Sequence, residues 1–125
     1  MPLTRHEAIA RCDAYAAAMT AGDPSMTVQL FAEDATHEEP IGTPTRHGRE
    51  EILAFLEGNA GVSLTMVRIG PVTVVGNHAA FQARVDVPTP DGQLSLTATD
   101  LITFDDAGLI GEIVVLPDIE ADPGS

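Results

Sequence analysis

The sequence predicts a single α+β domain in which a curved antiparallel sheet wraps over three N-terminal helices. Two observations favour this fold class. Helical periodicity and helix-capping signals occupy the first half of the chain, and alternating strand patterns separated by turn residues occupy the second half. We expect one domain over residues 1–116, followed by an acidic tail over residues 117–125 that is rich in Pro and Gly and frays.

Three helices are expected before residue 60. The first opens at a capping-box pattern, Thr-Arg-His-Glu at residues 4–7, and ends near Gly22. An Asp-Pro pair at residues 23–24 supplies an N-cap and a first helical proline, which predicts a short second helix to about Phe31. The third helix is expected over residues 48–59, with two glutamates in its first turn.

The periodicity then changes from helical to alternating, which indicates strands. Clusters of Gly, Asn, Asp and Pro separate the alternating segments and are typical of tight turns. The strands are expected at about residues 62–75, 78–87, 93–104 and 109–116.

The third of these strands carries a carboxylate on the face that should pack into the core. Its alternate residues are otherwise apolar: Leu94, Leu96, Ala98, Asp100, Ile102 and Phe104. An ionised carboxylate is costly in apolar surroundings, and a raised pKa that leaves the group neutral is the usual solution. A neutral carboxylic acid at Asp100 would be a hydrogen-bond donor suited to an oxyanion. The alternative is an edge or strand-end aspartate that turns to solvent.

Two further residues are candidates for chemistry. Tyr15 is the only tyrosine, and its helical spacing from Cys12 and Met19 places its ring beside the core, although a plain core tyrosine would look the same. Glu38 and Glu39 precede a proline, which favours an extended backbone and therefore opposite side-chain directions. One of the two can face a cavity while the other stays in water.

Composition excludes several classes of function. Six Arg and no Lys stand against 19 Asp plus Glu, a net charge of −13, so nucleic acid and anionic membranes are disfavoured as partners. The absence of Lys excludes Schiff-base chemistry and a Walker-type phosphate loop. His37, Glu39 and His47 lack a tight metal-ligand spacing. A lone Cys and a start without a secretion signal favour a cytoplasmic protein. The acidic charge balance and the absence of Lys favour an uncharged organic ligand.

Taken together, the placed residues resemble the Δ5-3-ketosteroid isomerases of the NTF2-like superfamily. The resemblance covers nearly the whole chain before the tail and rests on the stretches YAAAMTAGD (15–23), FAEDATHEEPIG (31–42), HGREEILAF (47–55), GPV (70–72) and TATDLITFDDAGLI (97–110).

The resemblance implies a fold, a reaction and a set of site residues. The fold would be an NTF2-like cone, and the reaction would move a proton from C4 to C6 of a 3-oxo-Δ5-steroid or related hydrophobic ketone through a dienolate. In this family a carboxylate base works with an oxyanion hole formed by a tyrosine and a protonated aspartic acid. Tyr15 and Asp100 match the oxyanion hole and Glu39 matches the base. The resemblance further implies no cofactor, no metal and a homodimer formed through the sheet.

The sequence departs from the family pattern at the base, where glutamate replaces aspartate, and at Phe31 and Leu56, where some members carry supporting tyrosines. Three alternatives therefore stand beside the isomerase. One is a SnoaL-like polyketide cyclase, and one is a non-catalytic module that binds a steroid or lipid. The third is an epoxide hydrolase, which the pattern disfavours. Such an enzyme would need an inward Asp-Arg-Asp set, whereas Arg84 and Asp86 fall in the outer phase of their strand.

Overall fold

The computed structural model describes residues 3–120 as three helices packed on a six-stranded sheet. The helices are α1 (Arg5–Ala21), α2 (Pro24–Val28) and α3 (Gly48–Gly58). The strands are β1 (Phe31–Glu38), β2 (Arg46–His47), β3 (Thr65–Val75), β4 (His78–Thr89), β5 (Gly92–Phe104) and β6 (Ile110–Asp118). The predicted α+β class and the three helices are confirmed.

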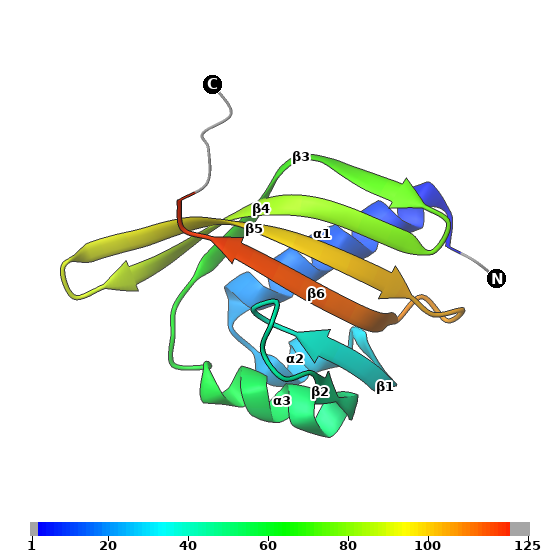
Figure 1. Ribbon diagram of the computed structural model, residues 1–125, viewed down its shortest axis with the longest axis horizontal. Coiled ribbons are helices and arrows are strands. Elements are labelled where there is room, and N and C mark those ends of the chain that lie inside the picture. The colour runs from blue at the N-terminus through cyan, green and yellow to red at the C-terminus, as the bar shows by residue number, and fades with distance from the viewer. Residues whose placement is uncertain (1–2, 121–125) are drawn as a thin grey trace.

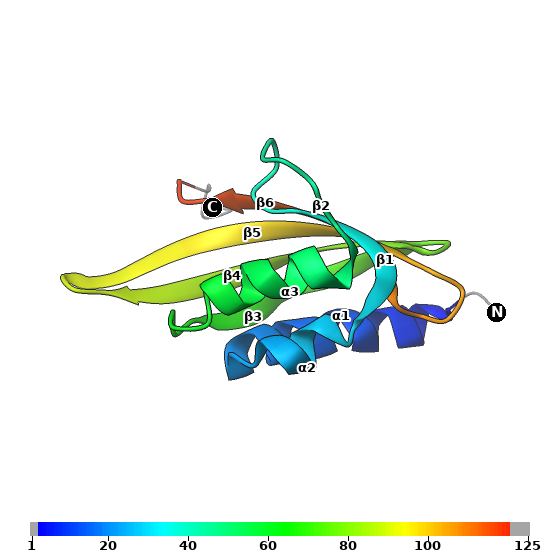
Figure 2. The same ribbon diagram turned by 90° about the horizontal axis from the view of Figure 1, so that it is seen from below.

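The sheet has the strand order β2-β1-β6-β5-β4-β3. Strands β3 to β6 form the predicted antiparallel meander, whereas β1 pairs with β6 in parallel, so the sheet is mixed rather than wholly antiparallel. The sheet curves, and all three helices lie on one face of it (Figures 1 and 2). The core therefore lies between the sheet and the helices, and no element among the described residues covers the other face of the sheet.

The capping signals in the sequence set the ends of the first two helices. At the start of α1 the Thr4 hydroxyl accepts from the Glu7 amide, and the Glu7 carboxylate accepts from the Thr4 amide. Gly22 ends α1 with a left-handed φ of 70°, a conformation that costs glycine little. The Asp23 side chain then caps α2, which ends at Val28, three residues before the predicted end.

Replacing Thr4 with Ala is expected to destabilise the protein by ~1 kcal/mol, because the first turn of α1 loses its capping acceptor. Urea unfolding followed by circular dichroism measures the change. Thr4→Ser is the matched control, since it keeps the hydroxyl and should retain most of the stability. Equal losses in the two variants would show that the methyl group of Thr4, and not the cap, is what matters.

Strand β1 was missed by the sequence prediction, which extended a helix to Phe31 and assigned no element to the segment that follows. The cause is visible in the register of the β1–β6 pair, which shifts between Phe31 and Thr36 and breaks the alternation of buried and exposed residues. At the other end of the chain, β6 continues to Asp118, two residues beyond the predicted strand. Residues 121–125 of the predicted tail lie outside the described part of the chain.

The core between the sheet and the helices is mostly aliphatic and aromatic, with three buried polar exceptions within the described part of the chain. These are Thr27, His37 and Asp100, and Tyr15 is a further polar-tipped side chain among the most deeply buried. Buried polar side chains are costly unless they are paired, so each needs a structural or functional reason. Within residues 3–120, the helices are all too short or too polar to cross a membrane.

Candidate active site

Asp100 lies in the middle of a central strand. Strand β5 has β4 on one side and β6 on the other, and Asp100 is opposite Phe81 and Val115 in the two ladders. Its side chain shares the inner face with Ala98 and Ile102, and the residue is only 1% exposed. The alternative of an edge aspartate turned to solvent is therefore wrong, and the predicted inward placement is confirmed.

The Asp100 carboxyl is poorly satisfied where it lies. Its Oδ1 atom is buried and has no hydrogen-bond partner among the described residues. Burial raises the pKa of Asp100 from its ordinary value of 3.8 to about 7, and the negative charge of Glu39 adds to this shift. A carboxyl group with this pKa is largely protonated below neutral pH, so that it can donate a hydrogen bond. A group in this state is suited to receive a ligand oxygen.

Tyr15 is buried on the sheet-facing side of α1, 2% exposed. Its ring packs edge-to-face on Phe31 with the ring centroids 6.2 Å apart. Burial raises the pKa of Tyr15 well above 10, and the charges of Glu39 and Asp100 raise it further. Tyr15 therefore stays a phenol, a hydrogen-bond donor, and its electrostatic neighbours are the two acids of the candidate site.

Glu39 directly follows β1 and is the acid that faces inward. The carboxylate of Glu38 is engaged elsewhere, because its Oε2 accepts from the Gly42 amide at 2.7 Å. The Glu39 side chain is 26% exposed and lines a cavity. The predicted opposite directions of the two glutamates are confirmed, and the structure shows that Glu39 is the one at the cavity.

The cavity beside Glu39 has a volume of about 150 Å³ and lies against the α1–α2 junction and α3. Its lining is mostly apolar, and among residues 3–120 the only charged side chains that line it are the acids Asp23 and Glu39. Tyr15 and Asp100 do not line it. A line of packed rings, Tyr15 to Phe31 to His37 to Phe55, leads from the buried phenol to the cavity wall.

His37 and Arg46 also belong to the site. The sequence pattern pointed to His37 only as a candidate metal ligand. The His37 Nε2 atom lies 3.4 Å from Glu39 Oε1, and the imidazole is 1% exposed. The Arg46 Nη1 atom lies 3.4 Å from the His37 Nδ1 atom. His37 and Glu39 are two residues apart in an extended segment, which places both side chains on one face, and this spacing was the available signal. No cluster of three or more His, Cys, Asp or Glu suited to a metal occurs within residues 3–120.

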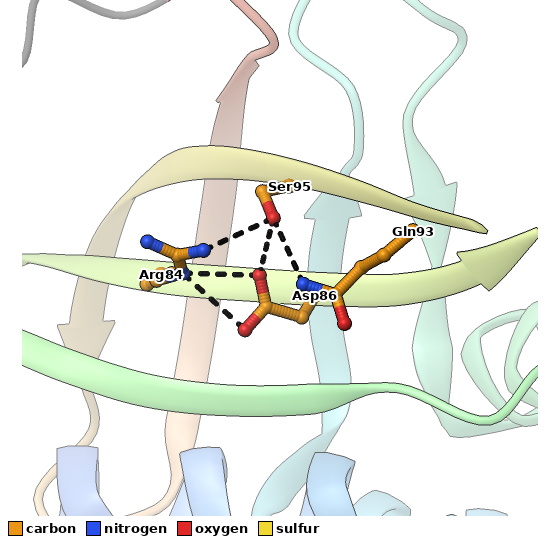
Figure 3. A network of polar contacts seen from close by, with 4 residues as sticks. All are labelled: Arg84, Asp86, Gln93 and Ser95. Carbon is orange, nitrogen blue, oxygen red and sulfur yellow. Dashed lines mark hydrogen bonds and ion pairs between the residues drawn. The ribbon is translucent and has the colours of Figure 1, made fainter.

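Arg84 and Asp86 form a separate polar network with Ser95 and Gln93 across β4 and β5 (Figure 3). Arg84 and Gln82 are exposed, as the outer strand phase predicts. The Asp86 carboxylate accepts hydrogen bonds from the Ser95 hydroxyl at 2.6 Å and from Arg84 Nε at 3.0 Å, and these contacts lower its pKa, the Ser95 hydrogen bond most. None of the four lines the cavity, so this network does not supply the inward acid-arginine set of an epoxide hydrolase.

Comparison with known proteins defines the class of the chain. The sequence profile of the SnoaL-like domain matches residues 12–113, which is most of the chain. The chain therefore belongs to the SnoaL-like domain family, which has the NTF2-like fold.

Two relatives are informative. A protein named steroid Delta-isomerase from Nocardioides simplex is 34% identical over 112 residues, covering 82% of this chain and 90% of that protein. The solved structure of SalBIII, described as an epoxide hydrolase/cyclase-like enzyme in pyran ring formation in polyether salinomycin, superposes with a TM-score of 0.81. That structure covers 90% of this chain at 22% identity, so its likeness shows the fold alone. The chain is thus a homologue of a steroid delta-isomerase.

Proposed function

We propose that the protein is a cofactor-independent isomerase that moves a proton from C4 to C6 of a 3-oxo-Δ5-steroid or a related β,γ-unsaturated ketone. The observation that carries this proposal is Asp100, a buried carboxyl with an unpartnered oxygen and a raised pKa whose charged and polar neighbours are Glu39 and Tyr15. The 34% identical steroid Delta-isomerase supports the same reaction.

Each of the three residues has a role in the proposed reaction. The Tyr15 phenol and the protonated Asp100 carboxyl donate to the C3 carbonyl oxygen of the substrate, which stabilises the negative charge of the dienolate. The Glu39 carboxylate removes the proton from C4 and returns it to C6. Proton, electrons and atoms balance within the substrate, so the reaction consumes no second reactant.

The lining of the cavity favours a neutral, apolar substrate. Its charged residues are acidic, so an anionic ligand would be repelled, whereas a ketone interacts through apolar contacts. At about 150 Å³ the cavity is smaller than the ~300 Å³ or more of typical small-molecule sites, so binding requires side-chain movement. Phe31, which packs on Tyr15, and Phe55, which lines the cavity, belong to the row of rings that must rearrange.

A homodimer formed through the sheet is also part of this proposal. Several large apolar side chains on β3 and β5 are exposed although they lie within the ordered sheet: Val67, Ile69, Val75, Leu94 and Leu101. A surface of this kind is typical of a protein–protein contact. We place the protein in the cytoplasm for the reasons given by its composition.

Purified protein given 5-androstene-3,17-dione is expected to produce the conjugated Δ4 enone, seen as a rise in ultraviolet absorbance. Turnover should not require added metal or cofactor, since the substrate's own carbonyl stabilises the carbanion. A sample unfolded by heat controls for the spontaneous reaction. Absence of turnover in folded protein would contradict the isomerase and leave the cyclase and the binding module.

A further inference from the structure

His37 occupies a site where an imidazole needs an explanation. It is 1% exposed, and its ring is packed against Phe31 and Phe55 with centroid distances of 6.3 Å and 5.0 Å. Apolar rings offer no hydrogen bonds, so the two ring nitrogens depend on their polar neighbours. Those neighbours are Arg46 at Nδ1 and Glu39 at Nε2.

Arg46 determines which nitrogen of His37 carries the proton. A guanidinium has only N–H donors, so the His37 Nδ1 atom beside it must be the acceptor. The proton of the neutral imidazole then lies on Nε2, the nitrogen that faces Glu39 Oε1 at 3.4 Å.

Arg46 is itself held in place. Its guanidinium carbon lies 3.8 Å from the centre of the Phe55 ring, a cation–π arrangement, and its Nη1 also donates to the Glu39 carbonyl oxygen at 3.3 Å. The same guanidinium therefore contacts the histidine and the backbone of the glutamate. The chain Phe55–Arg46–His37–Glu39 joins α3, β2 and β1 at the cavity.

We propose that His37 is a positioning residue for Glu39: held by Arg46 as the Nε2–H tautomer, it orients one carboxylate oxygen and leaves the other for the substrate. This inference rests on the proposed isomerase function. Glutamate has three rotatable side-chain bonds, and no hydrogen bond from another side chain to its carboxylate occurs within the described residues. At 3.4 Å the contact is long for a hydrogen bond, and such contacts often shorten when substrate binds.

The kinetic test compares His37→Leu with His37→Gln. Leucine fills the apolar site without a donor, and kcat is expected to fall ~10- to 100-fold with KM little changed, as for a displaced catalytic group. The amide N–H of glutamine reaches a position near that of Nε2, so His37→Gln should recover most of kcat. Equal kcat in wild type and His37→Leu overturns the proposal, as does an equal loss in both variants.

Nitrogen-15 NMR of the imidazole tests the tautomer without using activity. In the free protein, the neutral imidazole of His37 is expected to carry its proton on Nε2. Arg46→Met, which keeps contact with Phe55 but removes the donor, should shift the ring towards a mixture of tautomers. A neutral ring that carries its proton on Nδ1 in the wild type overturns the inference. Absence of turnover in the wild type would overturn the isomerase instead, whatever the tautomer.

Discussion

Glu39→Gln is expected to lower kcat about a thousandfold while the fold is retained. General-base catalysis by one side chain contributes roughly 10²- to 10⁴-fold, and glutamine keeps the shape of glutamate without its basic oxygen. The residue is at the cavity edge and 26% exposed, so the substitution should cost little stability. Steady-state kinetics by enone absorbance gives kcat and KM, and circular dichroism checks the fold.

Glu38→Gln is the matched control, because Glu38 is the adjacent acid and its carboxylate caps the Gly42 amide instead of facing the cavity. It should keep kcat within about twofold. A kcat unchanged in Glu39→Gln but lost in Glu38→Gln would transfer the base to Glu38. Glu39→Asp adds a third point, since it withdraws the carboxylate by ~1 Å from both His37 and the substrate and should lower kcat less than glutamine does.

The inward side chain of Asp100 could be read from the sequence because strand alternation is a local property. Leu96, Ala98, Ile102 and Phe104 fix one face of the strand, and Asp100 falls on it. Its central position could not be read in the same way. Strand order depends on pairing between distant segments, and β6 lies between β5 and β1 although β1 comes first in the chain.

The parts of the site that the sequence did not predict all involve β1. A shifted register hides its alternation, and its residues are largely polar, so no apolar pattern marks it as a strand. The sequence pattern therefore does not reveal how deeply His37 is buried in the core. Arg46 comes from the short strand β2, whose pairing with His37 is a contact between strands that composition does not reveal.

Asp100→Asn is expected to change how stability depends on pH. The wild-type carboxyl has a pKa of about 7 when folded against an ordinary value of 3.8, so between these values the unfolded chain loses a proton that the folded chain keeps. The stabilising effect of the folded-state proton is complete below about pH 3.8, falls as pH rises and is lost above about pH 7. At ~1.4 kcal/mol for each pH unit, the free energy of unfolding that is lost between pH 3.8 and about pH 7 is on the order of 4 kcal/mol.

Asparagine has nearly the same shape and cannot ionise, so the variant lacks this pH-dependent loss. The free energy of unfolding of Asp100→Asn minus that of the wild type should therefore increase between pH 4.5 and pH 8. Urea unfolding of both proteins at several pH values measures the difference, in which the contributions of the shared acids largely cancel. A difference that stays constant over this range would mean that Asp100 ionises as it does in water.

Substitutions at Asp100 separate the effect of its hydrogen-bond donation on kcat from the effect of its burial on stability. Asp100→Leu removes the donor and should lower kcat ~10²- to 10³-fold, the loss typical of one oxyanion-hole donor. The leucine variant should nevertheless be at least as stable as the wild type at pH 8, because it removes a buried group whose Oδ1 has no partner. Asp100→Asn keeps an N–H donor and should retain more activity than leucine. A group that lowers stability but raises kcat is maintained for function. An Asp100→Leu variant that is more stable than the wild type and keeps its kcat would contradict that role for Asp100.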